Sequence, residues 1–173
     1  PTVLPYSSSQ FSLNKNSSIG ETMQTAIGQG DTLVSPFHMA LIVSAVANNG
    51  VLMTPYFVDH IENTDGIQVS ETKKMEYKKL MTSSEAQTLN EFMQSVVNGG
   101  TASSLSDMGV TIAGKTGSAE YEVDGNTGAE SNFSTHSWFA GFSNVDDPDI
   151  VVSVIAEDGG TGSSAAVPIA REI

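Results

Sequence analysis

The sequence has no cysteine, few basic residues and no long apolar run. The missing cysteine excludes disulfide frameworks, thiol nucleophiles and thiolate metal sites. No stretch approaches the roughly 18 consecutive apolar residues that a membrane-spanning helix needs. Seven basic against twenty acidic residues give a net charge of −13, which repels phosphate backbones and anionic lipid surfaces. We therefore expect no nucleic-acid partner.

The apolar content is that of an ordinary folded protein. Apolar residues make up 39% of the 173 residues, enough for the core of one compact domain or of a large piece of one. Residues 1–18 are rich in serine, proline and asparagine and predict an irregular lead-in. Beyond them, no linker, repeat or low-complexity tract indicates a second domain.

Two segments predict helices with one buried face. In residues 35–49, Ser35 suits the N-cap and Pro36 the first helical position, and apolar residues recur at helical spacing. In residues 82–98, Thr82 and Glu85 have the spacing of a capping box ahead of an apolar stripe. Residues 165–173 predict the start of a further helix.

The last third of the chain predicts antiparallel β-structure. A polar connection over residues 122–135 and a turn over residues 144–149 separate three strands, expected around residues 110–120, 137–143 and 150–157. Earlier in the chain, the turn residues 63–66 predict a small hairpin between residues 56–58 and 67–69. The expected fold class is α+β, with a partial antiparallel sheet of about three strands packed against helices.

The first of these strands contains Gly114-Lys115-Thr116-Gly117. A Lys-Thr-Gly tripeptide is a weak signal by itself, and an isolated match is more simply a half-exposed strand with a solvated lysine. Its specificity comes from the segments around it and from their order along the chain.

An ordered set of segments resembles the class B penicillin-binding proteins from about Ser18 onward. The set is Ala26-Ile27-Gly28-Gln29-Gly30, Ser35-Pro36, Ala47-Asn48-Asn49-Gly50, Thr54-Pro55, residues 113–120, residues 136–142 and residues 166–170. The resemblance implies a portion of the serine β-lactamase/penicillin-binding transpeptidase fold. Residues 1–173 would then be a single C-terminal portion of the transpeptidase domain.

The resemblance also implies an activity. The family's enzymes are D,D-transpeptidases that cross-link peptidoglycan through a serine acyl-enzyme. The implied partners are a stem peptide ending in D-Ala-D-Ala and the β-lactams that mimic it, with no metal and no organic cofactor. The parent protein would be extracytoplasmic, anchored to the cytoplasmic membrane by a segment outside this chain.

The implied substrate-binding residues are Lys115, Thr116, Gly117 and Ser118. A terminal carboxylate requires a cation and a hydroxyl donor on a rigid element, which Lys115 and Thr116 would supply. Gly117 would leave room for the ligand, and the backbone N–H of Ser118 would be an oxyanion donor. Strand alternation places Lys115 and Thr116 on opposite sides, so alternation alone does not bring both to one ligand.

The nucleophile is not expected in this chain. Ser12-Leu13-Asn14-Lys15 and Ser70-Glu71-Thr72-Lys73 match the family's Ser-x-x-Lys pattern. However, the family's serine opens a buried helix far upstream of the Gly-Gln-Gly stretch. Ser12 lies in a polar segment too close to Gly28, and Ser70 lies downstream. We therefore expect the chain alone to be inactive, with an exposed apolar face covered by the missing N-terminal half or by self-association.

The sequence does not predict a metal site, but it leaves two alternative functions open. The three histidines include no pair with metal-ligand spacing, and the acidic turn lacks the glycine and glutamate of an EF-hand. A D,D-carboxypeptidase or a serine β-lactamase would share Lys-Thr-Gly. A non-catalytic β-lactam sensor or binding module would share the whole fold.

Overall fold

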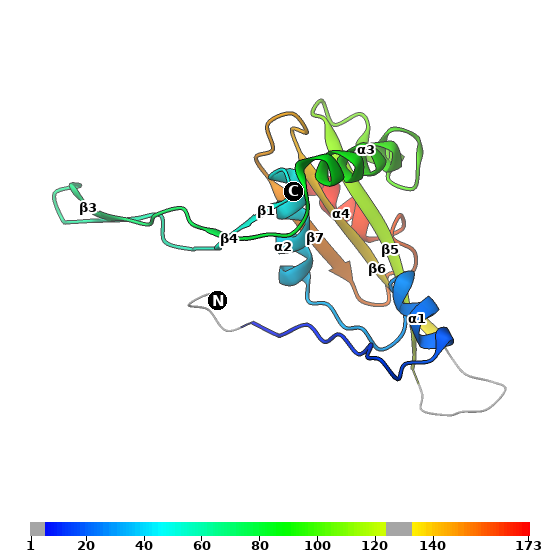
Figure 1. Ribbon diagram of the computed structural model, residues 1–173. Coiled ribbons are helices and arrows are strands. Elements are labelled where there is room, and N and C mark those ends of the chain that lie inside the picture. The colour runs from blue at the N-terminus through cyan, green and yellow to red at the C-terminus, as the bar shows by residue number, and fades with distance from the viewer. Residues whose placement is uncertain (1–5, 124–132) are drawn as a thin grey trace.

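The computed structural model describes residues 6–123 and 133–173. Its centre is an antiparallel sheet with the strand order β5 (Ile112–Glu122), β6 (Phe133–Ser143) and β7 (Val151–Ala156). Helices α2 (Pro36–Ala47), α3 (Ser83–Gly99) and α4 (Ala166–Glu172) pack around it (Figure 1). The predicted α+β fold with three antiparallel strands is confirmed.

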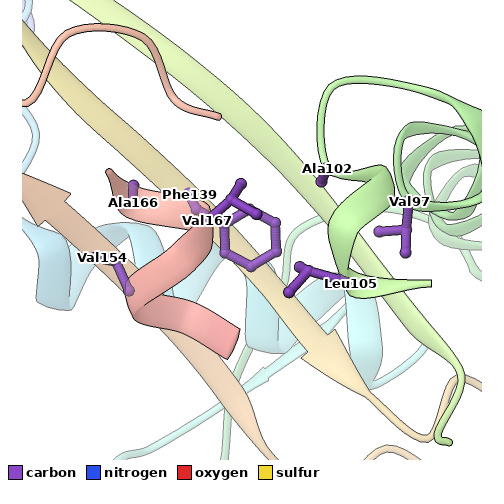
Figure 2. Close-up of a cluster of buried hydrophobic side chains, with 7 residues drawn as sticks. All are labelled: Val97, Ala102, Leu105, Phe139, Val154, Ala166 and Val167. Carbon is purple, nitrogen blue, oxygen red and sulfur yellow. The ribbon is translucent and has the colours of Figure 1, made fainter. Parts of the chain in front are cut away.

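Successive side chains of β6 enter two separate cores. Phe139 enters the α4-side core, shown in Figure 2, which consists of Val97, Ala102, Leu105, Phe139, Val154, Ala166 and Val167. The short 3₁₀ helix η1 (Ser103–Leu105) contributes to this core. The α2-side core consists of Val43, Val46, Ala113, Ala140 and Phe142. Because a slip of one residue would exchange the two faces, this double burial fixes the register of the sheet.

The predicted starts of α2 and α3 are confirmed by their caps. The Oγ atom of Ser35 accepts a hydrogen bond from the N–H of His38 at 3.2 Å, and Pro36 takes the first helical position. Thr82 and Glu85 form both bonds of a capping box, at 3.2 and 2.7 Å. Within the described ranges, none of the helices is long and apolar enough to cross a bilayer.

Helix α1 (Ile19–Ala26) is not predicted above, although a capping box precedes it. The Oγ atom of Ser18 accepts from the N–H of Glu21, and the carboxylate of Glu21 accepts from the N–H of Ser18. The apolar side chains of this helix and its end are largely exposed, among them Ile19 and Ile27. In the described structure, local capping rather than burial therefore accounts for α1.

Residues 51–80 form an arm that projects away from the sheet (Figure 1). In it β1 (Val51–Met53) pairs with β4 (Glu76–Lys79), and β2 (His60–Glu62) pairs with β3 (Gln68–Glu71). The hairpin and its turn are as predicted, but its first strand is not residues 56–58. The side chain of Asn63 sets the register by accepting from the N–H groups of Asp65 and Ile67.

The connection before β6 is shorter at both ends than the predicted residues 122–135. Strand β5 continues to Glu122 and β6 already begins at Phe133, where these two residues pair. These strand ends are exposed and are held by pairing with each other, so no apolar run in the sequence marks them as strand. Residues 124–132 of the predicted connection lie outside the described residues.

Two glycines face each other where β5 and β6 cross the core. Gly114 pairs with Gly141 in the register of the two strands. A Cβ atom added at Gly141 would lie 2.6 Å from the carbonyl oxygen of Ala113 and 2.9 Å from Cζ of Phe139. The ring of Phe139 therefore fills the space that side chains would otherwise take at this pair of positions.

Candidate functional site

Lys115, Thr116, Gly117 and Ser118 lie in the middle of β5, which pairs with β6 on one side. In the described part of the chain, no strand pairs with the other edge of β5. The carbonyl of Thr116 accepts a hydrogen bond from Nζ of Lys115 at 2.7 Å, and the carbonyl of Ser118 accepts from Nε2 of Gln29 at 2.8 Å. Both carbonyls are thus directed to this free edge.

The N–H group of Ser118 shares the direction of its carbonyl. In an antiparallel pair, a residue exchanges both its N–H and its C=O with the opposite residue, or it exchanges neither. Since the carbonyl of Ser118 takes a side-chain donor at the free edge, its N–H is directed to the same edge. A backbone donor in this position can meet an oxygen of a ligand that lies along β5.

Lys115 carries an exposed cation at this edge. Its ammonium group donates to a backbone carbonyl, and within the described residues it makes no salt bridge. Among the residues that the structure describes, no carboxylate therefore neutralises this charge. An anionic group of a ligand could take this contact, and the bond would then be charge-assisted on both sides.

Thr116 is nearly buried, on the side of β5 opposite to Lys115. Thr116 is 9% exposed, and its hydroxyl lies 2.6 Å from the hydroxyl of Thr101. A hydroxyl has one proton and two acceptor sites, so Thr116 can accept from Thr101 and still donate its own proton. The pair is therefore compatible with a proton donor in the site, but this hydroxyl is not free.

Gly162 packs directly against the strand of the site. A Cβ atom added at Gly162 would lie 2.7 Å from Cβ of Thr116 and 2.8 Å from the carbonyl oxygen of Gly117. The N–H of Gly162 donates to Oγ of Ser118 at 3.2 Å. The segment between β7 and α4 thus sets how much room surrounds Thr116.

Buried Ser137 ties the same segment to β6. Its hydroxyl donates to the carbonyl of Thr161 at 2.6 Å and accepts from the N–H of Ala166 at 2.9 Å.

Opposite Gly117, Trp138 approaches closely, since an added Cβ at this glycine would lie 3.3 Å from Cβ of Trp138. On the β6 side Gly117 therefore has little spare room, and a larger residue would press on the sheet.

A polar cluster around Asp158 holds the start of the segment between β7 and α4. The carboxylate of Asp158 accepts a hydrogen bond from the hydroxyl of Tyr121 at 2.6 Å and another from the hydroxyl of Ser134. The rings of Tyr121 and His136 stack at 4.3 Å. The hydroxyls of Ser134 and Tyr121 lower the pKa of Asp158, and the bond to Asp158 raises the pKa of Tyr121.

Replacing Asp158 with asparagine is expected to lower the pKa of Tyr121 toward its ordinary value, because the carboxylate that disfavours the phenolate is removed. Asparagine also tolerates the left-handed backbone of this position, where φ is +53°. The measurement is a pH titration of isotope-labelled tyrosine by NMR, with Tyr121→Phe identifying the signal. Asp149→Asn, which removes a carboxylate from the β6–β7 turn, serves as the control. An unchanged Tyr121 titration in Asp158→Asn would contradict the contact.

The same cluster makes the attachment of this segment to β5 and β6 depend on pH. The pKa of Asp158 in the folded protein is lowered, so its contribution to stability is present above its unfolded pKa. That contribution is lost as the pH falls through the folded pKa. Acidification is therefore expected to loosen the attachment of the segment to β5 and β6.

Neither of the two Ser-x-x-Lys matches opens a helix. Ser12 is in a stretch without secondary structure, and Ser70 is exposed in strand β3 of the arm. Each therefore lacks the buried helix start that the pattern requires. Among the described residues, no group of three or more His, Asp and Glu side chains is arranged to hold a metal ion.

Three further residues touch the strand of the site from distant parts of the sequence. Gln29 contacts Ser118, and Thr101 contacts Thr116. Gly162 contacts both Thr116 and Ser118. Gln29 belongs to a segment used above for the resemblance, without a role of its own. Spacing along the sequence gives no signal for such contacts, because they depend on how the segments pack.

Comparison with known proteins gives a consistent result. The family model described as the penicillin binding protein transpeptidase domain matches residues 1–173. The peptidoglycan D,D-transpeptidase PbpA of Mycolicibacterium smegmatis is 32% identical over 152 residues, which are 85% of this chain and 30% of that protein. The peptidoglycan D,D-transpeptidase MrdA of Haemophilus influenzae is 30% identical over 165 residues, 89% of this chain and 25% of that protein.

The fold agrees with solved structures of the same kind. The ceftriaxone acyl-enzyme complex of penicillin-binding protein A from M. tuberculosis superposes with a TM-score of 0.72 at 30% identity. The match covers 86% of this chain and 32% of that one. The chain thus spans a third or less of the length of these relatives. The expected resemblance and fold are confirmed.

Proposed function

Since this chain belongs to the penicillin-binding protein transpeptidase family, we propose that it forms part of a peptidoglycan D,D-transpeptidase. The observation that carries the proposal is the free edge of β5, where the cation of Lys115 and the N–H of Ser118 lie along one strand. The match of the family model to the whole chain and the printed names of both relatives support it.

The proposed reaction is acyl transfer in two steps. A serine outside this chain attacks the carbonyl carbon of the amide in D-Ala-D-Ala, and the terminal D-Ala leaves as the amine. The amine of a neighbouring stem peptide then attacks the acyl-enzyme ester and releases the serine. A β-lactam takes the place of the peptide in the first step, which the acyl-enzyme structure of the M. tuberculosis relative supports.

Each residue of the strand has a proposed role. Lys115 binds the terminal carboxylate of the substrate through its unneutralised ammonium group. Thr116 lies on the opposite side of β5, and its proposed role is to give that carboxylate a second donor, reached past the edge of the strand, while it accepts from Thr101. Gly117 keeps the strand close to β6 and free of a side chain. The N–H of Ser118 stabilises the oxyanion as one of two donors, the other being the N–H of the serine nucleophile.

The exposed apolar side chains support a partner surface on this chain. Ile19, Met23 and Ile27 recur along α1 and its end, with exposed fractions of 81%, 66% and 77%. We propose that the part of the transpeptidase domain that supplies the serine covers this face, or that a second copy does. The protein would act outside the cytoplasmic membrane, held there by a segment that is not in this chain.

The activity is tested with the full-length protein that carries this chain. It is incubated with a stem peptide ending in D-Ala-D-Ala and an amine acceptor, and free D-Ala and the cross-linked product are measured. Transfer to the amine supports a transpeptidase. Release of D-Ala with water as the only acceptor would indicate a D,D-carboxypeptidase, and binding without release a non-catalytic module.

Residues 1–173 alone are expected not to be labelled covalently by a fluorescent penicillin. Acyl transfer requires a nucleophile, a base and two oxyanion donors within a few ångströms, and we assign this chain one donor and the carboxylate-binding residues. Denaturing electrophoresis and intact mass measure the adduct, and the full-length protein is the positive control. A stoichiometric adduct on Ser12 or Ser70 would contradict the proposal that the nucleophile lies outside.

A further inference from the structure

The bond from Gln29 to Ser118 joins two segments that are 89 residues apart in the sequence. Nε2 of Gln29 donates to the carbonyl of Ser118 at 2.8 Å, and Figure 1 shows α1 beside the sheet at this end of β5. The carbonyl belongs to the free edge, where no neighbouring strand in the described structure holds it. The amide of Gln29 thus takes the place of a strand partner for this one group.

The backbone of Gln29 is fixed by the end of α1. The N–H of Gln29 donates to the carbonyl of Gln24 at 2.9 Å, and the N–H of Gly28 donates to the carbonyl of Thr25 at 3.0 Å. These two bonds form a Schellman motif, which requires the left-handed backbone of Gly28, where φ is +80°. Gln29 therefore extends from a rigid helix end and not from an unconstrained loop.

We infer that Gln29 is a positioning residue for acyl transfer, which it serves by holding the peptide groups of Ser118 at the free edge of β5. The inference rests on the proposed function, in which the N–H of Ser118 stabilises the oxyanion. An edge strand without a partner can change its backbone direction at little cost, and an oxyanion donor must already point correctly when the charge develops. The fixed amide of Gln29 restricts the backbone at the residue that carries the donor.

A positioning role predicts a kinetic pattern that a purely structural contact does not give. Removing the amide leaves the ammonium group of Lys115 in place, so the initial binding of a β-lactam is expected to change little. The acylation rate constant at saturating β-lactam is expected to fall, since the donor is needed as the oxyanion forms. A merely structural contact would lower the melting temperature and leave this rate constant unchanged in the folded fraction.

The test uses two variants of the full-length protein. Gln29→Met keeps the length of the side chain without a donor, and Gln29→Glu keeps its shape without a donor at neutral pH. Each is expected to slow acylation by a fluorescent penicillin about two- to tenfold, the range for one lost neutral hydrogen bond. Stopped-flow measurement over a range of β-lactam concentrations separates the rate constant from the dissociation constant. Gln87→Met, the same change on the exposed face of α3, is the control and should leave both constants unchanged.

Lys115→Ala, measured in parallel, separates the two levels of inference. If Lys115→Ala slows acylation and the Gln29 variants match Gln87→Met, the positioning role is overturned and the proposed function stands. If neither Lys115→Ala nor the Gln29 variants slow acylation, both are overturned. A Gln29 effect confined to the dissociation constant or to the melting temperature also overturns the positioning role.

Discussion

Replacing Lys115 with alanine is expected to slow acylation of the full-length protein by a β-lactam about ten- to a hundredfold. The loss of one charge-assisted hydrogen bond is worth roughly 1.5–3 kcal/mol, which corresponds to this range. The ammonium group is exposed and bonds only to a carbonyl of its own strand among the described residues, so its removal should leave the fold nearly intact. The second-order acylation rate constant is the quantity to measure.

The matched control is Lys78→Ala. Lys78 is also exposed on an antiparallel strand, β4 of the arm, and its loss changes the net charge by the same amount. It should leave the acylation rate unchanged. Equal rates for Lys115→Ala and Lys78→Ala would remove β5 as the binding edge. Thr116→Val is expected to slow acylation as well, but it also leaves the hydroxyl of Thr101 without its partner, so Lys115→Ala is the cleaner measurement.

Gly141→Ala is expected to destabilise the domain by about 3 kcal/mol, the upper end of the usual cost of overpacking a core. The added Cβ would lie 2.6 Å from the carbonyl oxygen of Ala113 and 3.0 Å from Cα of Gly114, and backbone atoms cannot move aside as a flexible side chain can. Strand β5 would have to shift relative to β6. Thermal unfolding of the full-length protein measures the effect, together with the β-lactam acylation rate of the folded fraction.

Gly99→Ala is the control for this substitution. Gly99 is the last residue of α3, and an added Cβ would meet no atom within 4 Å. Alanine favours the helix over glycine by up to about 1 kcal/mol, so this variant should be neutral or slightly stabilised. If Gly141→Ala were as stable as Gly99→Ala, the close packing of β5 on β6 at the glycine pair would be disproved.

The elements that the sequence predicts well are those with a local signal and a buried face. Ser35-Pro36 and the pair Thr82 and Glu85 mark the starts of α2 and α3, and both helices bury apolar residues against the sheet. Helix α1 has the capping box but exposes its apolar residues, so its burial pattern gives no second signal. Strands β2, β3 and β4 of the arm are short and exposed, and no alternation of burial marks them.

The candidate site likewise contains residues that the sequence predicts and residues that it does not. The residues from Lys115 to Ser118 follow one another on one strand, so their sequence pattern and the structure agree on where they lie. Gln29, Thr101 and Gly162 reach that strand from three other segments. Such contacts follow from the packing of α1, of the turn after α3 and of the segment before α4. A single sequence carries no pattern for them.

The order of the strands has a consequence for how the free edge of β5 forms during folding. Strands β5, β6 and β7 follow one another in the chain and pair with their sequence neighbours, so each pairing closes a short loop. The contact of Gln29 with Ser118 closes a loop of 89 residues, at a larger entropic cost. Local pairings of this kind form more readily than distant ones. The sheet can therefore assemble first, and the edge that faces the ligand is completed only when α1 docks on it.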